Sequence, residues 1–216
     1  MVGVARLRTR ARAGVVVTLR HAEMLNPDGT IYTKNLRGAA ATDVYVSKGG
    51  EQEWQPAFTF HGFRYVELTG LEEPPQLGDV EGVVLGSDLE STGTFTCSDE
   101  RLNQLQSNIA WGLRGNYLSI PTDCPQRDER MGWMADAQVF TPTAAFHADN
   151  IGMAAVHRHS RHRAAPQAQT KGAVAPSAVA AFAVWALAGP VEPRRPTLRH
   201  QAMVRFRPSS IVTCGS

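Results

Sequence analysis

The hydrophobic pattern of the chain changes its period near residue 95, and this change constrains the possible folds more than any other feature. Upstream, short apolar runs are separated by turn signals at residues 26–29 (NPDG) and 49–50 (GG), which is typical of antiparallel strands. Downstream, apolar residues recur at the helical spacing of three or four: Leu102, Leu105, Ile109 and Leu113. The sequence therefore predicts an α+β chain, a β-rich part followed by helices.

Seven short runs upstream of residue 98 have the composition of strands. They are residues 14–20, 30–32, 43–47, 57–60, 63–68, 80–85 and 94–97. His61-Gly62 breaks the aromatic-rich part of this series. We predict an antiparallel β-sandwich domain over residues 1–95. Since its first strand starts almost at Met1 and a sandwich with too few strands has open edges, we expect the natural domain to begin upstream.

Residues 96–150 are predicted to form helices. Ser98 is a suitable N-cap, and the acids at 99 and 100 would interact favourably with the helix dipole. We expect this helix to end at Gly115 and a second one to run from about residue 135 to residue 148. Pro142 lies inside the second helix and should kink or split it.

The composition changes again near residue 150. From Gly152 to the end there is one acid, Glu192, against nine Lys and Arg residues and four of the seven histidines. This one-sided charge and the frequent prolines predict that residues 151–216 are an irregular tail, either disordered or frame-shifted. His157, His159 and His162 resemble a metal-binding tract, but their spacing suits one helix face poorly and no acid accompanies them, so we do not expect metal there.

Charge and apolar content exclude several classes of protein. A formal net charge of +2 over 216 residues does not indicate nucleic acid or an anionic membrane as partner. We find no signal peptide, and no apolar run approaches the roughly 20 residues that a spanning helix needs. Three widely spaced cysteines give neither a disulfide framework nor a zinc pattern, so we expect a cytoplasmic, reducing location. The sequence leaves the oligomeric state open.

The most unusual segment is Thr122–Val139, TDCPQRDERMGWMADAQV. Pro125 keeps the residue before it out of the α region, so the segment must begin as a loop. It gathers carboxylates, guanidinium groups and one indole: Asp123, Asp128, Glu129, Asp136, Arg127, Arg130 and Trp133. Acids of mixed role beside an aromatic platform suit a site that cleaves sugars. The alternative is a charged, solvated loop that leads into a helix.

Each of these residues also has a structural interpretation. Glu129 could be a salt-bridged surface acid, Asp123 and Asp136 could be caps of turns or helices, and Trp133 could be a core residue. Cys124 has no accompanying His and Asn pattern of a thiol nucleophile. No loop with the oxygen ligands of a calcium site is present, so we expect neither a metal nor another cofactor.

Residues 122–149, TDCPQRDERMGWMADAQVFTPTAAFHAD, resemble the signature of the bacterial α-L-rhamnosidases, glycoside hydrolase family 78. Three upstream segments are similar to the same family. They read VTLRHAEMLNPDGTIYTKNLRGAAATDVY, FTFHGFRYVELTG and SDLESTGTFTCSDERLNQLQSNIAWGLRGNYLSIPTDCPQRDER. The resemblance runs from about residue 15 to about residue 150. One departure is Met134-Ala135, where the family usually has Thr-Gly.

This resemblance implies a β-sandwich followed by the first helices of an (α/α)₆ barrel, and an inverting hydrolysis that releases L-rhamnose from glycosides. Glu129 matches the general acid. Asp123, Arg127 and Asp136 match residues that hold the rhamnose hydroxyls, and Trp133 matches an aromatic wall of the sugar pocket. The family's general base lies in a later part of the barrel. We therefore expect this chain alone to have little or no hydrolytic activity.

Two further interpretations remain open. The β-rich part could bind glycans without catalysis, through aromatic residues within 58–65. The one-sided tail and the open sheet edge also fit a poorly folded translation product without a function of its own.

Overall fold

The computed structural model describes residues 1–76 and 78–149 and the backbone of residues 201–205. Its residues form two compact units. The first comprises residues 1–85, residues 125–128 and the strand at 201–205; the second comprises residues 86–124 and 129–149. The predictions for residues 150–200 and 206–216, including those on the tail histidines, lie outside the described residues.

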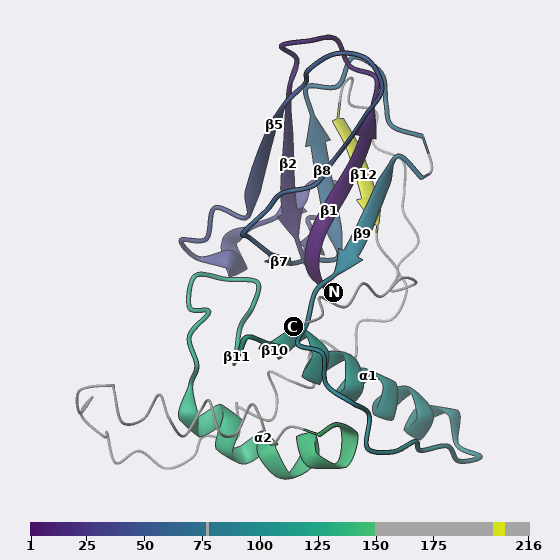
Figure 1. The fold of residues 1–216 in the computed structure, drawn as a ribbon, viewed down its shortest axis with the longest axis vertical. Coiled ribbons are helices and arrows are strands. Elements are labelled where there is room, and N and C mark those ends of the chain that lie inside the picture. The colour runs from purple at the N-terminus through teal and green to yellow at the C-terminus, as the bar shows by residue number, and fades with distance from the viewer. Residues whose placement is uncertain (77, 150–200, 206–216) are drawn as a thin grey trace. The chain divides into compact units, whose positions relative to one another are not determined.

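One sheet of the first unit is built around β1 (Val2–Thr9), shown in purple in Figure 1. β1 pairs antiparallel with three strands, β6 (Gln52–Trp54), β7 (His61–Gly62) and β9 (Val80–Val84). Side chains alternate along β1, so Leu7 is fully buried while Arg8 reaches outward to Glu53, Nε to Oε2, over 2.8 Å.

The second sheet of this unit has the order β12-β8-β2-β5 and is also antiparallel. Its strands are β12 (Gln201–Arg205), β8 (Tyr65–Thr69), β2 (Val16–Ala22) and β5 (Thr42–Val46). Val17, Leu19, Val66 and Leu68 have 1% exposure or less, and they form the apolar face of this sheet. A hairpin of β3 (Met24–Leu25) and β4 (Ile31–Tyr32), a 3₁₀ turn η1 (Lys34–Leu36) and the buried Phe63 complete the unit.

The strand predictions fail at residues 57–62. We expected a strand at 57–60 and a break at His61-Gly62, but residues 57–60 are irregular and His61-Gly62 is the strand β7. Phe58 has a φ of 59°, outside the β region, which interrupts any strand there. β7 forms because the edge of β1 offers it partners, Val2 opposite Gly62 and Gly3 opposite His61.

A strand also occurs in the segment that we predicted to be irregular throughout. Residues 201–205 form β12, which pairs with all five residues of β8. The prediction was wrong for these residues because it considered only local composition. The unpaired N–H and C=O groups along the free edge of β8 supply the partner, and no local signal reports that edge.

The second unit contains two helices, α1 (Glu100–Asn116) and α2 (Met134–His147), within its described residues. A short hairpin of β10 (Tyr117–Leu118) and β11 (Ile120–Pro121) follows α1. The helices share a small core in which Leu113, Tyr117, Ala144 and Ala148 are buried and Phe140 packs edge-on against Tyr117, with ring centroids 6.2 Å apart. Of the described helices, none has the length and apolarity to cross a membrane.

The helix predictions are right in position and wrong at the ends of α1. The N-cap is Asp99 and not Ser98, because the Asp99 carboxylate accepts a hydrogen bond from the N–H of Arg101 at 2.9 Å. The helix continues past Gly115 to Asn116. Of its predicted apolar stripe, only Leu113 is buried, and Leu102 and Leu105 are each 47% exposed.

Two local predictions near the helices also need correction. Residues 94–97 form no strand, because the Asn103 side chain takes the place of a strand partner: Cys97 N–H donates to Asn103 Oδ1 at 2.9 Å, and Asn103 Nδ2 donates to Cys97 O at 2.8 Å. Pro142 does not split α2, which runs unbroken from Met134 to His147. The broader prediction, antiparallel sheets followed by a helical region, is confirmed.

Candidate active site

The charged segment begins at an anchor on the end of α1. The N–H of Thr122 donates to Asn116 O at 2.8 Å, and the Thr122 hydroxyl donates to the same carbonyl at 3.2 Å. This carbonyl lies in the last turn of the helix, where no intrahelical N–H remains to pair with it. Thr122 therefore closes the β10–β11 hairpin against the end of α1. This contact fixes the point from which the chain continues into Asp123.

The middle of the segment, residues 125–128, belongs to the first unit and packs on its loops. A Cβ built on Gly62 would lie 2.7 Å from the Cβ of Gln126, so the close approach requires glycine in β7. Asp128 Oδ2 accepts a hydrogen bond from Gly38 N–H at 3.2 Å. Asp128 is thus an exposed positioning residue of this segment, and Arg127 beside it is half-buried.

Two of the predicted acids come together in the second unit. Asp123, Glu129 and the thiol of Cys124 each offer a ligand atom, and these atoms lie within 4.8 Å of one another. Asp123 and Glu129 are half-buried and Cys124 is buried. The sequence predicted both acids as site residues, and the fold brings their carboxylates to one place although five residues separate them.

Asp136 joins this group electrostatically from the first turn of α2. Burial raises the pKa of the Asp136 carboxyl above its ordinary value, and the negative charges of Asp123 and Glu129 raise it further. The three carboxylates therefore form one acidic group, in which the charges of Asp123 and Glu129 act on Asp136. Such shifts are common where carboxyl groups act in catalysis.

Trp133 lies directly before α2, as its N-cap residue, and its side chain makes no capping hydrogen bond. It is 42% exposed, so the core-packing interpretation fails for the residues that the structure describes. A solvent-exposed indole three residues from Asp136 is available to pack against a ligand. Arg130 between the acids has a φ of 34°, a strained conformation of the kind that accumulates at functional sites.

Two of the four aromatic residues proposed for glycan binding without catalysis are buried. Phe63 is fully buried and Tyr65 is 8% exposed, so both belong to the core of the first unit. Phe58 is fully exposed. A carbohydrate-binding surface over residues 58–65 would therefore depend on Phe58 and the half-buried Phe60.

The donor atoms of the acidic group can be compared with the ligands that metal ions prefer. Asp123, Cys124 and Glu129 combine two hard oxygen ligands with one soft sulfur ligand. Such a set suits neither calcium nor magnesium, which prefer oxygen alone, and it lacks a histidine.

Each of the two units matches a known protein family. Residues 1–86 match the family model of the bacterial alpha-L-rhamnosidase concanavalin-like domain, and residues 90–196 match that of the bacterial alpha-L-rhamnosidase 6 hairpin glycosidase domain. The chain is 59% identical over 152 residues to an alpha-L-rhamnosidase of Formosa agariphila, which covers 69% of this chain and 16% of that protein.

The chain is also similar to solved structures of alpha-L-rhamnosidases. The chain is similar to Streptomyces avermitilis alpha-L-rhamnosidase complexed with L-rhamnose, with 56% identity, a TM-score of 0.68 and coverage of 69% of this chain and 15% of that one. It is also similar to the alpha-L-rhamnosidase of Dictyoglumus thermophilum, with 48% identity, a TM-score of 0.68 and coverage of 70% and 17%. The chain thus spans a small part of the length of these relatives. With both of its units matched, the chain belongs to the bacterial α-L-rhamnosidase family, glycoside hydrolase family 78.

Proposed function

We propose that this chain is the part of an inverting α-L-rhamnosidase that carries the general acid and one side of the rhamnose site. The observation that carries the proposal is the grouping of Asp123, Glu129 and Asp136 in the second unit, with a raised pKa at Asp136. The substrates are glycosides with a terminal α-L-rhamnose. A non-catalytic binding role has less support, because Phe63 and Tyr65 are core residues.

The two helices are the first of an (α/α)₆ barrel in this proposal, and the two sheets of the first unit are its accompanying β-sandwich. The shared core of Leu113, Tyr117, Ala144 and Ala148 supports it, since consecutive helices of such a barrel must pack on each other. We place the change between the two domains near residues 86–95, where strand β9 has ended and α1 has not begun.

Glycoside hydrolysis with inversion requires one carboxyl that protonates the leaving oxygen and a second that activates water, about 6.5–9.5 Å apart. Glu129 is the proton donor in this scheme. The neighbouring carboxylates of Asp123 and Asp136 accept hydrogen bonds from sugar hydroxyls. The exposed indole of Trp133 packs on the apolar face of the deoxy sugar, and the guanidinium of Arg127 donates to its hydroxyls.

The general base is not among these residues. Sugar binding and hydrolysis can therefore be tested separately in this chain. With 4-nitrophenyl α-L-rhamnoside, we expect no release of nitrophenol by the 216-residue chain. Saturation-transfer NMR should show saturable binding of L-rhamnose, weakened at least about tenfold by Asp136→Asn or Asp123→Asn because each removes a charged acceptor. Glu129→Gln should keep most of the binding, since its role is proton transfer.

Asp128→Asn is the matched control, because Asp128 is exposed and its carboxylate reaches Gly38 in the first unit. L-Fucose, a deoxy sugar with other hydroxyl orientations, is the control ligand. Equal binding by the wild type and Asp136→Asn would contradict the assigned site. Turnover that Glu129→Gln abolishes would show that this chain contains its own base and would refute the proposed fragment.

A further inference from the structure

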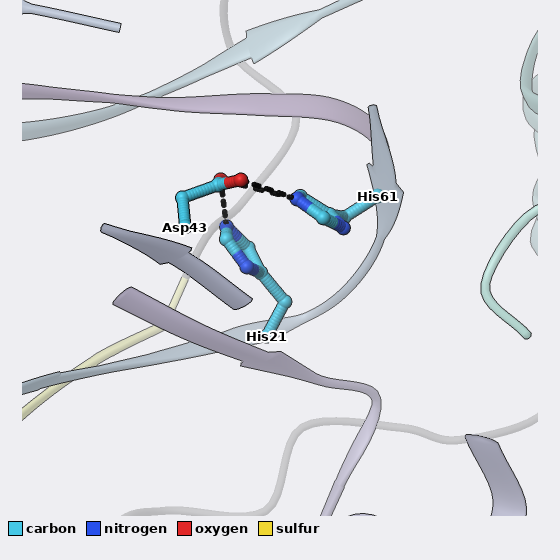
Figure 2. Close-up of side chains that lie close together, drawn as sticks. All are labelled: His21, Asp43 and His61. Atoms are coloured by element: carbon cyan, nitrogen blue, oxygen red, sulfur yellow. Dashed lines mark hydrogen bonds and ion pairs between the residues drawn. The ribbon is translucent and has the colours of Figure 1, made fainter. Parts of the chain in front are cut away.

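A second polar cluster lies in the first unit, buried between its two sheets. His21 is on β2, Asp43 is on the neighbouring strand β5, and His61 is on β7 of the other sheet. Figure 2 shows both imidazole rings directed at the Asp43 carboxylate. His21 is 1% exposed and His61 is 5% exposed, so these polar groups have left water. Nothing in the proposed rhamnosidase chemistry uses them.

The register of the second sheet explains how the cluster forms. Asp43 pairs with Leu19, and His21 is two residues farther along β2, so all three side chains lie on the same inner face. His61 approaches from β7, which is held by its pairing with Gly3 of β1. The cluster therefore joins strands of two different sheets.

The hydrogen bonds of His21 leave an electrostatic mismatch. Its Nδ1 lies 3.2 Å from the carbonyl oxygen of Ala41, so this nitrogen must carry the proton that the carbonyl accepts. In the neutral ring, Nε2 then carries a lone pair and is a hydrogen-bond acceptor. It faces a second acceptor, Asp43 Oδ2, at 3.8 Å. Nε2 makes no hydrogen bond with a described residue. A cation placed between these two groups would give His21 Nε2 the partner that it lacks.

The two imidazole rings are held side by side at the carboxylate. The rings of His21 and His61 are stacked with centroids 4.1 Å apart, and Figure 2 shows both directed at Asp43. The space beside the Asp43 carboxylate therefore has two ring nitrogens and carboxylate oxygens around it.

We infer that His21 Nε2, His61 Nε2 and the Asp43 carboxylate form a binding site for a divalent transition metal of the zinc type. Tetrahedral zinc with bonds of about 2.0–2.2 Å places its ligand atoms about 3.4 Å apart. Here Asp43 Oδ2 lies 3.0 Å from His61 Nε2 and 3.8 Å from His21 Nε2, and all three ligand atoms lie within 4.8 Å of one another.

The surroundings of the ligands also suit a metal. Histidine ligands commonly donate their other ring N–H to a backbone carbonyl, which orients the ring, and Ala41 does this for His21. Both Asp43 oxygens lie 3.0–3.1 Å from His61 Nε2, so a bidentate carboxylate can supply the fourth donor. On binding, the proton of His61 Nε2 moves to Nδ1 of the same ring, which makes no hydrogen bond with a described residue, and the freed Nε2 lone pair binds the metal. Bound there, it links β2 and β5 of one sheet to β7 of the other.

The test uses the complete chain freed of metal with a chelator, then titrated calorimetrically with Zn²⁺. We expect one equivalent to bind and to raise Tm, because binding favours the folded state. Ca²⁺ should do neither, since it prefers oxygen ligands. Asp43→Asn is nearly isosteric and should weaken Zn²⁺ binding at least about tenfold. His61→Gln is a second variant, and circular dichroism checks that each variant is folded.

Two control variants separate this site from other candidates in the chain. A triple variant, His157→Gln, His159→Gln and His162→Gln, removes the histidine tract of the tail, and Cys124→Ser removes the thiol beside the acidic group. Both should bind Zn²⁺ like the wild type. Co²⁺ should show tetrahedral visible bands without a thiolate charge-transfer band. Absence of binding, binding unchanged by Asp43→Asn and His61→Gln, or binding lost in either control would overturn the assignment.

Discussion

Two influences oppose each other at Asp136. The residue lies in the first turn of α2, where free N–H groups favour a carboxylate. Burial and the charges of Asp123 and Glu129 act the other way, and the raised pKa of Asp136 shows that they prevail. The spacing of these acids in the sequence does not decide this balance, because it depends on how far each carboxyl is withdrawn from water.

Asp136→Asn should stabilise the protein at neutral pH although it weakens sugar binding. A carboxyl with a raised pKa opposes folding once it is ionised. Below its ordinary pKa of 3.8 both states are protonated and there is no penalty; the penalty grows as pH rises and is complete above the folded-state pKa. We therefore expect Tm of Asp136→Asn to exceed that of the wild type at pH 7, with the difference vanishing near pH 3.5.

Asp128→Asn is the control, because Asp128 is exposed and hydrogen-bonded to Gly38. Its Tm should not rise at pH 7. A lower Tm for Asp136→Asn at pH 7 would mean that the helix dipole, and not the acidic neighbours, dominates at this position.

At the scale of elements, α1 shows how a helix can be predicted in position while its ends are not. Ser98 and Asp99 are both good N-cap residues, and propensity does not distinguish them. The fold selects Asp99, whose carboxylate accepts from the N–H of Arg101 and also pairs with the Arg101 guanidinium, Nη2 to Oδ2, at 2.8 Å. Asn103, which binds both backbone groups of Cys97, fixes the chain just before the cap.

Asp99→Ala should therefore lower Tm by a few degrees, whereas Ser98→Ala should leave it nearly unchanged. The hydrogen bonds from Arg101 hold the pKa of Asp99 below its ordinary value. The stabilisation from this cap is thus present above the ordinary pKa of 3.8 and is lost as pH falls through the lowered one. Thermal melts of the two variants at pH 7 test this; equal effects of both substitutions would contradict the assignment of the cap.

At the scale of the whole molecule, the first unit depends on residues far apart in the sequence. β12, at residues 201–205, pairs with β8 at residues 65–69 and occupies what would otherwise be a sheet edge. Strand edges with free N–H and C=O groups invite association with other chains. β12 thus affects both the stability of the second sheet and its tendency to associate.

Proline substitutions test this pairing at constant chain length. Successive N–H groups of a strand point to opposite edges, so only one of Met203 and Val204 donates to β8. One of Met203→Pro and Val204→Pro should lower Tm and speed hydrogen exchange at the β8 amides that face β12, and the other should be tolerated. β2 amides that face β5 are the internal control. Unchanged exchange in both variants would contradict the strand.

The sequence by itself determined the features that depend on neighbours along the chain. Alternation and turn residues located β2, β5, β8 and β9, helical spacing located α1 and α2, and the family motif singled out Asp123, Glu129 and Asp136. Tertiary structure decided what depends on distance through space. It made His61-Gly62 a strand and supplied β12 with a partner strand. It also left Trp133 exposed to solvent and brought the imidazole rings of His21 and His61 to the carboxylate of Asp43. The physical reason is that side-chain periodicity is local, whereas burial and hydrogen-bond partners are properties of the folded chain.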